Sequence, residues 1–162
     1  MTEQLLLFVE AALVAGLGIW MSVAVYDNWR HPYLNREAVA MVMRFDIMER
    51  DYPDDYAIVA HRKIENPTVI DLAFQTIRLA ETLAAILLMA GAGLLALSAL
   101  GSISADFATT WAVLATTFFS LIWAGFIVGG NYFHYYYCHQ WGQSNHFMFM
   151  YWGFFVLMML LI

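Results

Sequence analysis

Residues 5–26 read LLLFVEAALVAGLGIWMSVAVY, and Glu10 is the one charged residue in this stretch. A helix rises about 1.5 Å per residue, so a stretch of this length matches the ~30 Å hydrocarbon core of a bilayer. The stretch therefore predicts a membrane-spanning helix.

Three further apolar stretches follow, at residues 79–100, 107–130 and 142–162. The whole chain is 62% hydrophobic and 12% charged. An ordinary soluble domain has about 25% charged residues, so this chain could not cover a surface that faces water. We expect a single all-α domain over residues 1–162, an integral membrane four-helix bundle surrounded by lipid.

A polar loop at residues 27–78 separates the first two stretches and contains all seven Lys and Arg residues and nine of the 13 acids. Part of this loop has the apolar spacing of an amphipathic helix, lying on the membrane surface or packed on the bundle, with Asn35 as its cap. The apolar positions are Ala38, Met41, Val42, Phe45 and Met48. Asn66-Pro67 predicts the start of a helix that runs unbroken into the second span.

The formal charge of −6 gives no indication of a nucleic-acid partner. The sequence also lacks a Gly-rich phosphate loop, a nucleophile elbow and a His-Glu pair with metalloprotease spacing. An enzyme of a familiar type is therefore not indicated.

Four spans would bring the loops after the first and third spans to the same side, together with all five histidines and the single cysteine. The candidate metal ligands there are His134, Cys138, His139 and His146. Imidazole and thiolate bind copper or zinc, whereas the alternative is that these are interfacial residues of an aromatic belt. Heme is disfavoured because the first three spans contain no histidine.

Two acids fall within apolar stretches, where a carboxylate is costly unless it is protonated or paired. Glu10 could bind a proton, a cation or a partner helix, or it could snorkel to the interface or hydrogen-bond a neighbour. Glu81 lies three residues after Arg78, which predicts a local ion pair. The alternative is that Glu81 anchors the long loop through Arg62 or a polar side chain. Antiparallel spans place Glu10 and Glu81 near opposite faces of the membrane.

Several residues at characteristic spacings give the chain a family resemblance over nearly its whole length. They are Asn28, Asn35, Asp46, Arg62, Ile64, Pro67, Glu81, Gly129-Gly130, Phe133 and Trp141-Gly142-Gln143. The chain resembles a bacterial family of predicted small four-span integral membrane proteins, a family defined by a domain of unknown function. The resemblance implies an architecture and a structural polar set that fixes the long loop against the second span: Asn28, Asn35, Asp46, Arg62 and Glu81.

The chain departs from this family pattern at two places. Asn131 and Tyr132 replace an acid and a tryptophan after the two glycines, and His134, Cys138 and His139 replace other residues. The basic residues also lie in the long loop, so the positive-inside rule places that loop in the cytoplasm, whereas the resemblance places it outside.

Three functions are consistent with the sequence. We favour a non-catalytic accessory or scaffolding subunit that packs against other subunits of a larger complex, of respiratory or photosynthetic type, in the bacterial inner membrane. The alternative is a metal- or quinone-binding membrane protein that uses the His, Tyr and Cys cluster. The third is a small proton-coupled carrier in which Glu10 titrates.

Overall fold

The computed structural model describes residues 2–162, which fold entirely as helices and the turns between them. Four helices are long: α1 (Glu3–Arg30), α5 (Pro67–Ala99), α6 (Ala105–Tyr132) and α8 (Gln140–Leu160). The polar loop forms α2 (Pro32–Met43), α3 (Asp46–Asp51), α4 (Pro53–Val59) and a 3₁₀ turn at Ala60–Arg62, and α7 (Tyr135–Cys138) connects α6 to α8. The all-α prediction is confirmed.

Helices α1, α5 and α6 are each long and apolar enough to cross a membrane. They correspond to the predicted spans at residues 5–26, 79–100 and 107–130. Helix α8 does not meet the same criterion, because its first two turns carry Gln143, Ser144, Asn145 and His146.

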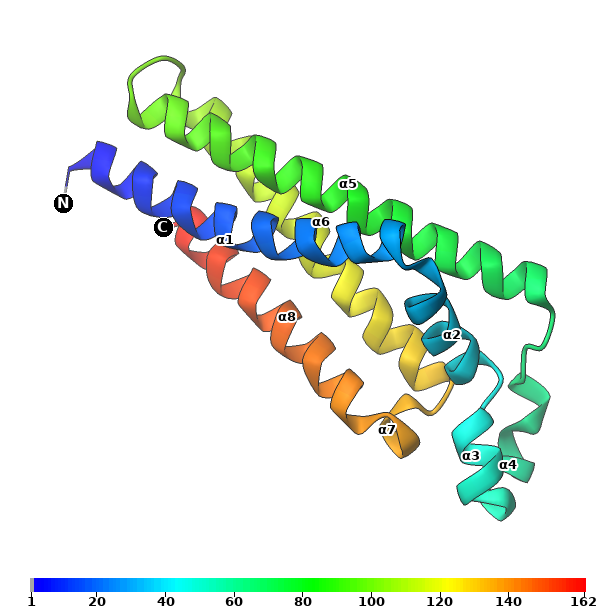
Figure 1. The fold of residues 1–162 in the computed structure, drawn as a ribbon. Coiled ribbons are helices and arrows are strands. Elements are labelled where there is room, and N and C mark those ends of the chain that lie inside the picture. The colour runs from blue at the N-terminus through cyan, green and yellow to red at the C-terminus, as the bar shows by residue number, and fades with distance from the viewer. Residues whose placement is uncertain (1) are drawn as a thin grey trace.

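The long helices run side by side, with both chain ends and the α5–α6 turn at one end of the molecule (Figure 1). Helices α2, α3, α4 and α7 lie at the other end. Helix α1 packs on α5, α5 on α6, and α6 on α8. Small residues allow close approach: a Cβ added to Gly91 would lie 3.2 Å from the Ala112 Cα, and one added to Gly153 would collide with the Ser120 side chain.

Side-chain caps explain where the long apolar helices begin. The backbone N–H groups of Leu5 and Phe107 donate to the hydroxyls of Thr2 and Ser104, which caps α1 and α6. Asn66 accepts from the N–H of Thr68 at 2.9 Å, and Pro67 occupies the first turn of α5. The predicted helix from Asn66-Pro67 into the second span is confirmed.

The predicted amphipathic helix over residues 38–48 is wrong in two respects. Asn35 lies inside α2, which begins at Pro32, and so does not cap it. The helix also breaks at Phe45, whose φ of 58° lies in the left-handed region. This turn buries the Phe45 ring, whose centroid lies 5.7 Å from that of Phe133. Burial of a large aromatic side chain offsets the backbone strain.

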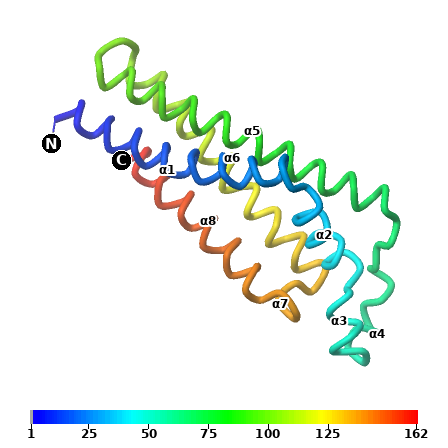
Figure 2. The backbone as a smooth tube through the Cα atoms, in the orientation of Figure 1, coloured from blue at the N-terminus to red at the C-terminus, as the bar shows by residue number. Residues whose placement is uncertain are grey.

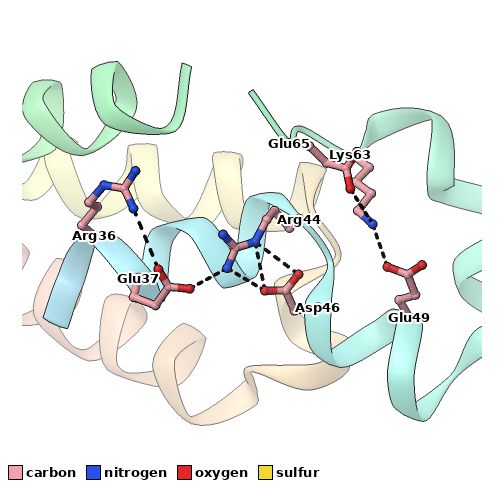
Figure 3. Close-up of polar contacts among 7 residues, drawn as sticks. All are labelled: Arg36, Glu37, Arg44, Asp46, Glu49, Lys63 and Glu65. Carbon is pink, nitrogen blue, oxygen red and sulfur yellow. Dashed lines mark hydrogen bonds and ion pairs between the residues drawn. The ribbon is translucent and has the colours of Figure 1, made fainter. Parts of the chain in front are cut away.

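Helix α2 packs on the bundle, with Ala40 and Met43 buried against Ile70 of α5. Figure 2 traces the chain from α1 through α2, α3 and α4 and back to α5. Ion pairs hold this segment together on its surface (Figure 3). Arg44 pairs with Glu37 at 2.6 Å and with Asp46 at 2.9 Å, and Lys63 pairs with Glu49 at 2.7 Å and with Glu65 at 3.0 Å.

Candidate functional site

A cavity of about 610 Å³ lies where α2, α5, α6 and α8 meet beside the end of α1. Its lining is mostly apolar and includes Phe74 of α5 and Trp123, Phe126 and Phe149 of α6 and α8. Leu121 and Gly125 also line it, and both are exposed on the second half of α6. The cavity therefore reaches the molecular surface within a helix that is apolar enough to cross a membrane.

A chain of hydrogen bonds brings the polar groups of the cavity together. Asn28 Nδ2 donates to Glu81 Oε2 at 2.6 Å, and Asn35 Nδ2 donates to Asn28 Oδ1. Glu81 is 5% exposed and Asn28 is 3% exposed. All three residues line the cavity, and they come from α5, α1 and α2. The chain thus connects the polar segment to two of the long helices.

The other two members of the structural polar set lie elsewhere. Asp46 pairs with Arg44 at the start of α3. Arg62 donates to the Tyr132 carbonyl at 3.1 Å, and its Nη1 lies 3.2 Å from His134 Nε2. The structure therefore gathers three of the five residues at the cavity and places the other two in the segment between α2 and α5.

The predicted ion pair between Arg78 and Glu81 is wrong: among residues 2–162, the ion pairs do not include it. The Arg78 guanidinium instead lies 3.8 Å from the centroid of the Trp29 ring and donates to Gln75. Trp29 is itself held by a hydrogen bond from Nε1 to Thr82 Oγ1 at 3.0 Å. Glu81 has its own partner in Asn28, so a cation–π contact replaces the expected pair.

Aromatic rings form a continuous wall along one side of the cavity. The Trp123 and Phe126 rings are stacked at 5.4 Å, the Phe126 and His146 rings at 4.7 Å, and the His146 and Tyr135 rings at 5.6 Å. Trp123 Nε1 and His146 Nδ1 are buried and find no hydrogen-bond partner in the described part of the chain. An unsatisfied buried polar group costs about 1–3 kcal/mol, which makes this wall a place where a bound molecule would gain contacts.

The four candidate metal ligands are spread over this end of the molecule. Among residues 2–162, no three His, Cys, Asp or Glu side chains lie close enough to hold a metal ion. The His139 and His146 rings both stack on the Tyr135 ring, with centroid distances of 5.0 Å and 5.6 Å. Burial lowers the pKa of His139, and burial together with Asp51 raises the pKa of the Cys138 thiol, which disfavours the thiolate that a metal requires.

His134 is engaged through both ring nitrogens. Its Nε2 faces the Arg62 guanidinium, which can only donate, and its Nδ1 lies 2.9 Å from the Tyr136 hydroxyl. Burial lowers the pKa of His134, and the charge of Arg62 lowers it further. His134 is therefore a neutral link between the turn before α7 and the 3₁₀ turn after α4.

Glu10 lies far from the cavity. It is 6% exposed and faces the interior of the bundle. Eighteen residues separate it from Asn28 on α1, which corresponds to about 27 Å along a helix. Glu81 contacts Asn28, so the predicted separation of Glu10 from Glu81 agrees with the fold.

Trp123, Phe126 and Phe149 were not among the site residues predicted from the sequence. They lie in helices with large apolar side chains on both the buried and the exposed faces, where hydrophobic periodicity gives little indication of which face is internal. The high aromatic content of residues 118–155 was the one available signal.

Long apolar helices joined through buried polar side chains define an integral membrane protein with three helices suited to crossing a bilayer. The comparison with protein families agrees with this class. The chain belongs to the family described as predicted small integral membrane protein (DUF2165), whose family model matches residues 6–162. No curated protein and no solved structure matches the chain.

Proposed function

We propose that this chain is a non-catalytic, four-span protein of the bacterial inner membrane that binds a small lipophilic molecule. The observation that carries the proposal is the cavity at the meeting point of α2, α5, α6 and α8. Its volume of about 610 Å³ falls within the range of roughly 300–1,000 Å³ that is usual for ligand sites. Mostly apolar walls with a few convergent polar groups are also typical of such sites.

The position of the opening supports a ligand that arrives from the bilayer. Leu121 is 62% exposed, and it lines the cavity from the middle of a membrane-spanning helix. A molecule dissolved in lipid could reach the cavity there without crossing the polar segment. The quinone alternative drawn from the sequence is one ligand of this kind.

The arrangement of the chain ends supports a fourth span. Helix α8 returns from α7 to the end that carries the N-terminus of α1 and the α5–α6 turn (Figure 1). Its 21 residues give a length of about 31 Å, which lets it extend from the interface across most of the ~30 Å hydrocarbon core. The polar first turns of α8 would then lie at the level of the interface.

Native mass spectrometry of the protein, extracted in mild detergent, tests ligand binding. We expect a bound molecule to be released from the wild type and to be lost in Val42→Trp, which places a large ring in the cavity lining. Val128→Trp is the matched control, because Val128 is exposed on α6 and does not line the cavity. An equal amount of the molecule on both variants would contradict the proposal.

A second function, as an accessory subunit of a larger membrane complex, is supported by one face of α8. Four large apolar side chains on this face are exposed at helical spacing: Met148, Tyr151, Phe155 and Met158. Aromatic and Met residues are enriched at protein interfaces. Purification in mild detergent followed by mass spectrometry should recover a stoichiometric membrane partner, and a chain that purifies alone as a monomer would exclude this function.

A further inference from the structure

Glu81 is a buried carboxylate for which the described chain supplies no cation. The ion pairs of residues 2–162 use other acids, namely Glu37, Asp46, Glu49, Asp51, Glu65 and Asp71. The hydrogen bond that Glu81 accepts comes from the neutral amide of Asn28 and occupies one oxygen, Oε2. The ionised form of a buried carboxyl group is strongly unfavourable without a counter-charge, so a cation bound here would stabilise the ionised form of Glu81.

The basic side chains of the surrounding segments contact partners other than Glu81. Arg78 lies one turn away on α5, but its guanidinium is held over the Trp29 ring at 3.8 Å. Arg62 is held by the Tyr132 carbonyl and His134. No Lys or Arg side chain is among the residues that line the cavity in the described chain.

Aromatic side chains line the same cavity as this carboxylate. Trp123, Phe126 and Phe149 line the same cavity as Glu81, with Trp123 at 5.4 Å from Phe126 and 4.8 Å from Phe149, measured between ring centroids. The face of an aromatic ring attracts a cation, and Trp attracts it most strongly. A carboxylate and aromatic walls together match an organic ammonium group.

We infer that the cavity takes a lipophilic organic cation, an amine or quaternary ammonium compound whose charged nitrogen lies against Glu81 and whose apolar body follows the wall of Trp123, Phe126 and Phe149. This inference rests on the proposed ligand-binding function and specifies the ligand class. A metal ion fits less well, because no three suitable ligands meet among residues 2–162. An oxidised quinone offers only acceptors and brings no positive charge to the carboxylate.

Two probes of the same shape, one cationic and one neutral, separate the effect of the ligand's charge on binding from the effect of its shape. One is 4-phenylbutyl-trimethylammonium, and the other is its neutral isostere, in which carbon replaces the nitrogen. Saturable binding of each is measured on the full chain in lipid nanodiscs, for the wild type, Glu81→Gln and Glu10→Gln. Glutamine keeps an oxygen that can accept from Asn28, and Glu10 is a second buried acid that does not line the cavity.

We expect the cationic probe to lose about 10- to 100-fold in affinity in Glu81→Gln, because the buried trimethylammonium group then lacks the negative charge of the carboxylate as its counter-charge. The neutral isostere should bind the wild type and Glu81→Gln equally, and Glu10→Gln should change neither probe. Phe126→Leu provides a second variant should Glu81→Gln fail to fold. It should weaken the cationic probe by about two- to fivefold through loss of an aromatic face, with the neutral isostere unaffected.

The two failures are distinguishable. Equal, saturable binding of both probes with no effect of Glu81→Gln would overturn the cation inference and leave the ligand-binding function standing. If neither probe binds saturably, and the quinone analogue decylubiquinone does not bind either, both the cation inference and the ligand-binding function are overturned.

Discussion

Replacing Asn28 with alanine removes the side chain that joins Glu81 on α5 to Asn35 on α2. Asn28 is 3% exposed, and its Nδ2 donates to Glu81 Oε2 at 2.6 Å. A hydrogen bond to a charged group contributes about 1.5–3 kcal/mol, and its loss leaves the acceptor buried without a donor. We therefore expect Asn28→Ala to lower the free energy of unfolding by about 2–3 kcal/mol.

Unfolding by SDS in mixed micelles, followed by far-UV circular dichroism and tryptophan fluorescence, measures this change. Asn131→Ala is the matched control, because Asn131 accepts from Gln143 Nε2 at 2.9 Å on the exposed surface. This control should cost less than about 1 kcal/mol. The variants Glu81→Leu and Asn28→Ala/Glu81→Leu complete a double-mutant cycle.

The cycle identifies the origin of the loss. If the cost arises from leaving the Glu81 carboxylate without its donor, the double variant should be more stable than the sum of the single losses by about 1–3 kcal/mol. Additive losses, or a loss below about 0.5 kcal/mol in Asn28→Ala, would show that the hydrogen bond between Asn28 and Glu81 does not stabilise the fold.

Three further changes test other parts of the structure. Gly153→Val should destabilise the packing of α8 on α6 by about 1–3 kcal/mol in the same unfolding assay, whereas Gly125→Val, where an added Cβ meets no atom within 4 Å, should not. Phe45→Ala should cost about 3–5 kcal/mol locally, measured as faster proteolysis between residues 46 and 66. Below about pH 6.5 the unfolded chain should bind more protons than the folded chain, because burial and Arg62 lower the pKa of His134. Stability should thus be full above that pH and fall as the pH decreases, with a smaller decrease in His134→Gln.

The parts of the fold that follow from local physical rules could be predicted from the sequence. Spans one to three follow from apolar length, and the start of α5 follows from the capping Asn66 and the fixed φ of Pro67. The family resemblance placed Asn28, Asn35 and Glu81 in one polar set with Asp46 and Arg62, and the structure joins the first three by hydrogen bonds.

Features that depend on tertiary contacts could not be predicted in this way. The apolar spacing of residues 38–48 continues in phase across Phe45, so nothing local indicates the left-handed turn that contact with Phe133 stabilises. The spacing of Arg78 and Glu81 permits an ion pair, but Trp29 and Asn28, both on α1, provide competing partners. Trp123, Phe126 and Phe149 were missed because large apolar side chains occur on both the buried and the exposed faces of α6 and α8, so hydrophobic periodicity does not mark the internal face.

The cavity lies between two groups of helices, which gives a bound molecule an effect on stability. Asn28, Asn35 and Glu81 tie α1, α2 and α5 together on one side, while the stacked rings of α6, α7 and α8 form the other. A ligand that binds only the folded state stabilises it by mass action, by about 2.7 kcal/mol when its concentration is 100 times Kd. Thermal unfolding of the wild type should therefore shift upward with increasing 4-phenylbutyl-trimethylammonium. The shift should be lost in Val42→Trp and kept in Val128→Trp, because Val42 lines the cavity and Val128 does not. An identical shift in both variants would mean that the probe stabilises the protein from its lipid-facing surface.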